Sequence, residues 1–137
     1  MRWLIMAALF LPVSGNTAVG SGYAVVVSSE SAIADMAPDK IRDIFLKRRN
    51  FEGGTRLIPV NLVGEDEPRR EFEAAVLGMD REAINRYWIS NHFQGVSPPT
   101  TQASLQSVKS FVENVDGAIG YVPLDMVDGN LRVVYEF

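Results

Sequence analysis

The stretch that decides the fold is Asp116-Gly117-Ala118-Ile119-Gly120-Tyr121-Val122-Pro123. Gly117 follows a helical pattern and can end that helix in the left-handed conformation, which glycine adopts without strain. The next residues are apolar and partly β-branched, and their run is too short for a helix, so it favours a buried strand. Gly120 has no side chain, which predicts the close approach of a neighbouring element, a bulge or a ligand. Pro123 cannot donate a ladder hydrogen bond and ends the strand. We therefore expect a central strand on which the helices pack.

The composition is typical of one globular domain with its own core, because the chain has 137 residues and no low-complexity segment. The net charge of −4 argues against a nucleic-acid partner. The absence of cysteine excludes disulfides, zinc–thiolate sites and thiol catalysis. The single histidine, His92, has no second histidine or acid at ligand spacing, so we interpret it as structural and expect no metal and no other cofactor.

Residues 1–18 have the pattern of a secretory signal peptide. Arg2 supplies the positive start, an apolar run follows from Trp3 to Val13, and small or polar residues come next. The run is too short for a comfortable membrane span, although an uncleaved N-terminal anchor is the alternative interpretation. The sequence thus predicts export and a mature domain of residues 19–137.

Strands and helices alternate along the mature chain, which predicts an α/β layer architecture. The second strand contains Pro59, which suggests an edge position or a bulge. The basic trio 47–49 ends the first helix, where cations favour the helix dipole; we prefer this interpretation to a nucleic-acid patch. The helix that begins near Pro68 should bury Phe72, Ala75, Val76 and Met79. Strands are expected at 23–27, 57–62, 118–122 and 131–137, and helices from Pro38, from Pro68 to Gly78, after an Asp80 cap, and from a Ser104 cap to Gly117.

A polar loop, Ser28-Ser29-Glu30-Ser31, follows the first strand. In open α/β sheets, ligands gather at the carboxyl ends of strands, so these hydroxyls are candidate ligand contacts. The alternative is that the serines simply form turns.

Several short motifs, taken in order, resemble the phosphate-type periplasmic substrate-binding proteins of ABC transporters, in particular the short, single-lobed members. The resemblance covers about residues 23–135. It implies a single lobe of the type 2 periplasmic-binding-protein-like fold, with a mixed sheet flanked by about four helices. The matching segments are residues 40–46 and 57–62, Asp66-x-x-Arg69-x-x-Phe72, Tyr87-Trp88, Phe93-Gln94-Gly95, Pro98-Pro99 and residues 117–122.

The resemblance also implies a set of ligand-binding residues. Full-length members bind an oxyanion between two lobes through helix N-termini, hydroxyls and an arginine. Arg69 matches the arginine of the motif Ser-x-x-Arg-x-x-Phe, whereas its serine position is Asp66 here. A carboxylate repels phosphate unless one of the two is protonated; the alternative is that Asp66 turns away as a helix cap. Ser28, Ser29 and Ser31 lie roughly where members place polar groups. The glycine-rich first ligand loop of full-length members is missing.

Two functions remain open on the sequence. The first is a periplasmic solute-binding protein for phosphate or a related oxyanion, with an ABC transporter as partner. The second is an accessory module of the cell envelope that kept the fold, lost the anion site and contacts another protein or a second copy of itself as a homodimer. We expect no enzyme, because no catalytic triad, paired catalytic carboxylates or Walker-type loop stands out.

Overall fold

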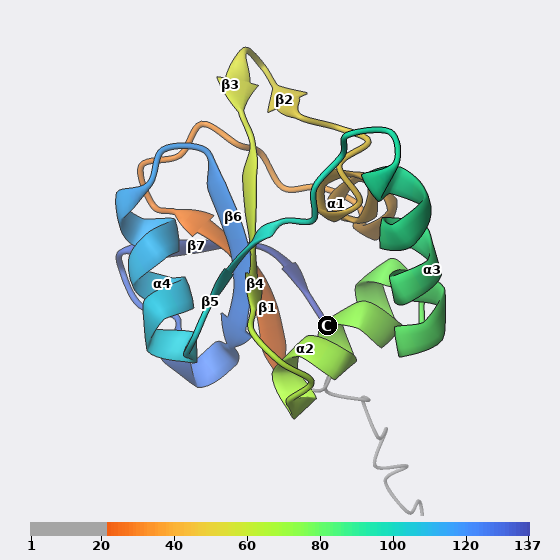
Figure 1. The fold of residues 1–137 in the computed structure, drawn as a ribbon. Helices are drawn as coiled ribbons and strands as arrows, with labels where there is room; N and C mark the ends of the chain where they lie inside the picture. Colours follow the sequence, from red (N-terminus) through yellow and green to blue (C-terminus); the bar gives the residue numbers. More distant parts are fainter. Residues whose placement is uncertain (1–21) are drawn as a thin grey trace, which may run out of the picture.

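The computed structural model describes residues 22–137, so the predicted signal peptide lies outside the described residues. One five-stranded mixed sheet crosses the molecule in the order β5-β4-β6-β1-β7, with helices on both faces (Figure 1). The strands of this sheet are β1 (Tyr23–Ser28), β4 (Ile58–Leu62), β5 (Thr100–Gln102), β6 (Ala118–Pro123) and β7 (Leu131–Glu136). The helices are α1 (Pro38–Phe45), α2 (Glu67–Phe72), which continues as the π-helical turn η1 (Glu73–Leu77), α3 (Arg81–His92), α4 (Leu105–Asn114) and the short 3-10 turn η2 (Leu124–Met126).

The predicted central strand is confirmed, since β6 is the third of the five strands and pairs with β4 on one side and β1 on the other. β4 runs parallel to β5 and β6, whereas β1 runs antiparallel to β6 and β7. The alternation of β6 divides the core between the two faces of the sheet. Gly120 faces Val108 and Val112 of α4, and Tyr121 stacks on Phe72 of α2 at a ring distance of 4.2 Å.

Both glycines of the deciding stretch have the roles that the sequence predicts. Gly117 has a φ of +77°, and a Cβ there would lie 1.9 Å from the carbonyl oxygen of Arg56. A Cβ at Gly120 would lie 2.9 Å from side-chain atoms of both Val60 and Val112. The close neighbours at Gly120 are therefore α4 and β4 rather than a bulge or a ligand, and the missing side chain lets the helix lie directly on the sheet.

The prediction of an edge position or bulge at Pro59 is wrong, because β4 lies between β5 and β6 in regular register. The amide of Ile58 donates to Gly117 on the β6 side, so the nitrogen of Pro59 faces the β5 side. Pairing with β5 begins only at Val60, which leaves no ladder hydrogen bond for Pro59 to make.

The helix after Pro68 buries a different set of residues from the predicted one. Phe72 and Val76 are buried as expected and Met79 packs partly buried against the core, but Ala75 is exposed. The π-helical turn rotates the chain after Phe72 and turns Glu73 and Leu77 inward instead. The predicted caps at Asp80 and Ser104 are confirmed, since their side chains accept the amides of Ala83 and Ser107.

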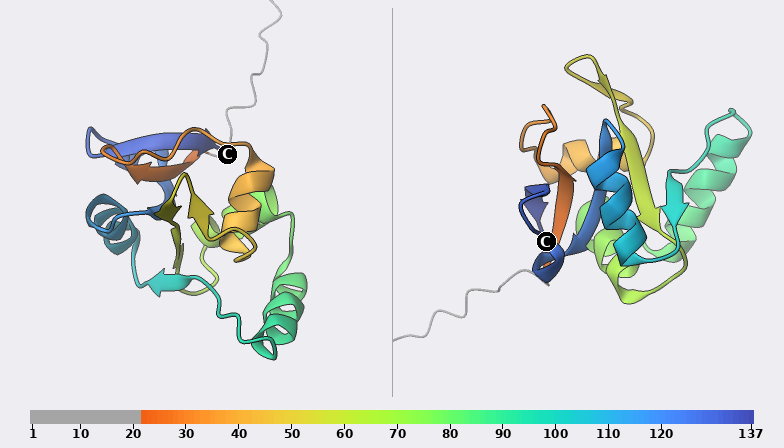
Figure 2. Two further views of the ribbon diagram at one scale, coloured as in Figure 1. Left: turned by 90° about the horizontal axis from the view of Figure 1, so that it is seen from above. Right: turned by 90° about the vertical axis from the view of Figure 1, so that its left-hand side faces the viewer.

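Two extended elements were not predicted. A hairpin of β2 (Phe51–Glu52) and β3 (Thr55–Arg56) turns at Gly53-Gly54, and β5 forms just after Pro98-Pro99, where no strand was expected. The hairpin projects beyond the amino end of β4, away from α2 (Figure 2). Within the described residues, no helix is long and apolar enough to cross a membrane.

Candidate functional site

The carboxyl ends of the parallel strands β4 and β5 meet the N-termini of α2 and α4. A cavity of about 440 Å³ opens there. In open α/β sheets this is the end where ligands bind, and the first turn of each helix presents unpaired N–H groups with positive potential. We call this the strand-end cavity; it is lined by Leu62, Asp66, Pro68, Ala103, Ser104, Leu105, Gln106 and Met126.

Three polar side chains line the strand-end cavity, Asp66, Ser104 and Gln106. Asp66 is the N-cap residue of α2, yet its carboxylate accepts no capping hydrogen bond, so it stays available to a ligand. Ser104 caps α4 by accepting the amide of Ser107 at 3.1 Å, which fixes the start of that helix at the cavity. The cavity combines one free carboxylate with hydroxyl, amide and backbone donors.

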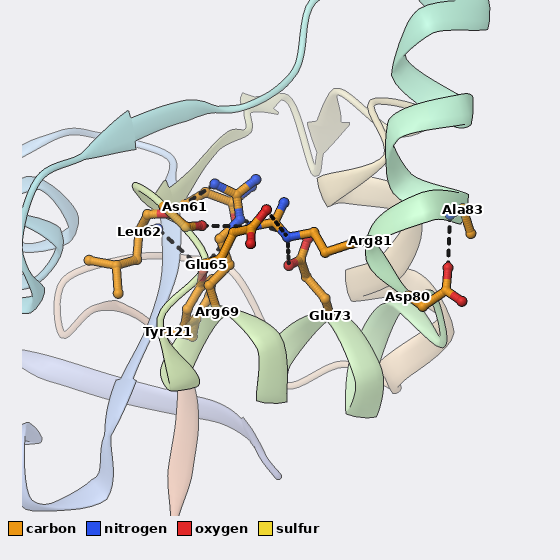
Figure 3. Close-up of polar contacts among 10 residues, drawn as sticks. Asn61, Leu62, Glu65, Arg69, Glu73, Asp80, Arg81, Ala83 and Tyr121 are labelled. Carbon is orange, nitrogen blue, oxygen red and sulfur yellow. Dashed lines mark hydrogen bonds and ion pairs between the residues drawn. The ribbon is translucent and has the colours of Figure 1, made fainter.

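Arg69 does not line the strand-end cavity but supports one of its walls. Its Nη1 donates to the carbonyl of Leu62 at 3.0 Å, and its Nε lies 3.7 Å from Oε2 of Glu73 (Figure 3). These contacts engage the guanidinium within the protein. Arg69 therefore positions the end of β4.

Glu73 lies between two arginines and is almost completely buried. Nε of Arg81 is 3.7 Å from Oε1 of Glu73, and Nη2 of Arg81 donates to the carbonyl of Gly64 at 2.6 Å. Burial raises the pKa of Glu73, and the neighbouring Arg69 and Arg81 guanidinium groups oppose that shift without cancelling it. The two arginines and Glu73 together hold the loop between β4 and α2, which carries Asp66.

Tyr121 ties the central strand to the same wall. Its hydroxyl donates to Oδ1 of Asn61 at 3.1 Å and accepts the amide of Leu62 at 3.2 Å. Burial raises the pKa of Tyr121, so the hydroxyl stays protonated at neutral pH. Sequence reasoning missed Asn61, Glu73, Arg81 and this role of Tyr121. Only the spacing of Arg69 and Glu73, four residues apart, was a usable signal for an ion pair.

The structure does not bring the serine loop to the strand-end cavity. Ser28 ends β1 next to the start of β6, because Val27 pairs with Ile119, whereas the cavity lies at the carboxyl end of β4. Ser28 and Ser31 accept the amides of Glu30 and Ile33, as turn-forming serines do.

A separate cavity of about 320 Å³ contains Ser28 and Ser31 together with three carboxylates, which disfavour an anion there. Ser29 lies beside it in the same loop and is exposed. One site therefore cannot combine Ser28, Ser29 and Ser31 with Asp66 and Arg69. Over residues 22–137, no group of histidine, cysteine, aspartate and glutamate side chains is arranged to hold a metal ion.

No family model matches the chain, and a search of curated proteins finds no match. Solved structures do match. One is a protein from Clostridium perfringens, assigned as a phosphate ABC transporter substrate-binding protein and solved with bound phosphate, at a TM-score of 0.67 and 18% identity. Another is an ABC-type phosphate transport receptor from Vibrio cholerae, at a TM-score of 0.64 and 17% identity. Each comparison covers 82% of this chain but only 44% and 45% of those chains, so this chain spans less than half of their length. The predicted fold is confirmed.

Proposed function

We propose that the chain is a solute-binding domain of the kind that serves ABC transporters, and that it binds phosphate or a related oxyanion in the strand-end cavity. The observation that carries this proposal is the match over 82% of the chain to a substrate-binding protein with bound phosphate. Both similar structures are substrate-binding proteins and not enzymes. The proposal includes export to the periplasm through residues 1–18, with residues 19–137 as the binding domain.

The chemistry of the strand-end cavity favours a protonated oxyanion. The N-terminus of α4 and the side-chain amide of Gln106 offer donors to anionic oxygens, while Asp66 offers a carboxylate that only accepts. Phosphate at neutral pH still carries at least one hydroxyl, which can donate to Asp66. Sulfate carries none and would meet Asp66 as a like charge. We therefore expect Asp66 to select phosphate over sulfate.

Replacing Asp66 by asparagine tests this selection. We expect Asp66→Asn to lower the phosphate affinity about tenfold, the scale of one hydrogen bond to a charged group, and to raise the sulfate affinity. Titration calorimetry with each anion on the full chain measures both constants. Asp116→Asn is the matched control, because Asp116 is exposed and lines the cavity at the opposite end of the sheet. Equal phosphate binding by wild type, Asp66→Asn and Asp116→Asn would place the ligand outside both cavities.

An envelope accessory module is the second candidate function. It is favoured by the contacts of Arg69 with Leu62 and Glu73, which engage its guanidinium within the protein. A module of this kind would contact another protein or a second copy of the chain. It would show no phosphate binding in the same titration.

A further inference from the structure

Charge is distributed very unevenly over the described chain. Residues 38–56 contain six basic and three acidic side chains, whereas the other described residues contain six basic and fourteen acidic ones. Helix α1, the residues that follow it and the β2–β3 hairpin form this positive region. We call it the basic hairpin surface; its basic residues are Lys40, Arg42, Lys47, Arg48, Arg49 and Arg56.

Ion pairs hold the hairpin against α1, so the two elements form one continuous surface. Nζ of Lys40 lies 2.7 Å from Oε1 of Glu52, and Nη1 of Arg49 lies 3.3 Å from Oε2 of the same carboxylate. The hairpin projects from the body of the molecule, on the opposite side from α2 (Figures 1 and 2). The surface is therefore separate from the strand-end cavity.

Neither Lys47 nor Arg56 forms an ion pair with an acidic side chain among the described residues. Partial burial and then the Arg56 guanidinium lower the pKa of Lys47, as expected for two neighbouring cations. Repulsion among cations that lack acidic partners destabilises the free protein slightly, and an anionic partner that covers them would relieve this repulsion.

The backbone of Lys47 is a second, independent observation. Its φ is +61°, and it is the one non-glycine residue with a positive φ among those that the structure describes. Lys47 follows the C-cap residue of α1, a position at which glycine would avoid the strain. A lysine kept in a strained conformation beside another cation points to a use for its charge.

An exposed aromatic ring accompanies the cations. Phe51 of β2 is 61% exposed, and the hairpin tip next to it is Gly53-Gly54, with open space around both glycines. Aromatic rings next to lysine and arginine are typical of surfaces that lie on the headgroup region of a bilayer. A projecting, positively charged surface of this kind is complementary to the anionic headgroups of a lipid bilayer.

We propose that the basic hairpin surface docks the protein onto an anionic lipid bilayer, with Lys47 and Arg56 against the headgroups and the Phe51 ring at the interface. The acidic remainder of the molecule, including the strand-end cavity, then faces away from the bilayer. This orientation leaves the cavity open to solvent while the protein is bound.

Vesicle co-sedimentation of the full chain tests this docking. The vesicles are phosphatidylcholine with about one third phosphatidylglycerol, compared with pure phosphatidylcholine. We expect the strongest binding to the anionic vesicles at about 0.02 M salt, weaker binding to them at about 0.15 M, and much weaker binding to the neutral vesicles. Lys47→Gly and Arg56→Gln should each lower the partition coefficient about fivefold, the usual contribution of one basic residue near an anionic bilayer.

Two comparisons separate docking from other effects. Arg86→Gln removes the same charge from an exposed residue of α3 and should bind like wild type. Lys47→Gly relieves the left-handed strain, so its melting temperature should not fall even as its binding does. All variants share residues 1–21, so their differences report on the basic hairpin surface.

Three outcomes would overturn the proposal. They are wild-type binding that is absent or equally strong on neutral vesicles, an equal loss in Arg86→Gln and Arg56→Gln, and tighter binding to a short DNA duplex than to the vesicles at the same salt. The last result would assign the surface to nucleic acid instead.

Discussion

Replacing Gly117 by alanine is expected to lower the free energy of unfolding by about 3 kcal/mol or more and to leave little folded protein. The new Cβ would lie 1.9 Å from the carbonyl oxygen of Arg56, and that oxygen belongs to backbone that cannot simply rotate away. The φ of +77° adds the strain of a left-handed alanine. Urea unfolding followed by circular dichroism measures the loss.

Gly129→Ala is the matched control for this change. A Cβ added at Gly129 would meet no atom within 4 Å, and the φ of Gly129 is not positive. Alanine there should therefore change the free energy of unfolding by less than about 1 kcal/mol. If Gly117→Ala unfolded at the same urea concentration as Gly129→Ala, Gly117 would not fix the approach of the hairpin to the central strand.

Glu73→Ala is expected to destabilise the protein by about 3 kcal/mol at neutral pH. The side chains of Arg69 and Arg81, which are 15% and 27% exposed, would lose the carboxylate that lies between them. Removing one partner of a buried ion pair is costly because the remaining charge is left without compensation. Urea unfolding again measures the effect. Glu82→Ala is the control, since the Glu82 side chain is 78% exposed and, within residues 22–137, its one ion pair is with Arg86. Its loss should cost less than about 0.5 kcal/mol.

The pH dependence of Glu73 has an unusual sign. Burial raises the pKa of Glu73 in the folded protein, so the folded state binds a proton more readily than the unfolded state. The unfolding free energy therefore increases as the pH falls from above the folded pKa toward the ordinary value of 4.5. Glu73→Gln lacks this titration, and the stability of wild type relative to Glu73→Gln should rise over that interval. A difference that falls as the solution is acidified would show that the arginines outweigh burial.

The elements that the sequence predicted well are those in which local chemistry and burial agree. The run from Ala118 to Pro123 is apolar, and Gly117 before it and Pro123 at its end each have a distinct backbone conformation that marks a strand boundary. Asp80 and Ser104 have the side chains that helix N-caps require. The hairpin and β5 were missed because they are only two or three residues per strand, too short for periodicity to indicate.

The candidate site was less predictable because it depends on tertiary contacts. A regular helix would place Ala75 toward the core, but the π-helical turn turns Glu73 there instead, and no pattern in the residues 67–77 signals that turn. Asp66 was identified only through a motif, and its free carboxylate is evident only once α4 supplies the facing wall. Arg69 was singled out as a ligand-binding residue, and its contacts with Leu62 and Glu73 are ones that the motif did not indicate.

Thermal unfolding of the full chain with phosphate, sulfate or chloride at matched ionic strength tests solute binding most directly. Phosphate at about one hundred times its dissociation constant should stabilise the folded state by roughly 2.7 kcal/mol, which raises the melting temperature by about ten degrees for a domain of this size. Sulfate and chloride should produce a much smaller rise. An identical melting temperature in all three anions would contradict the solute-binding function and leave the envelope accessory module in its place.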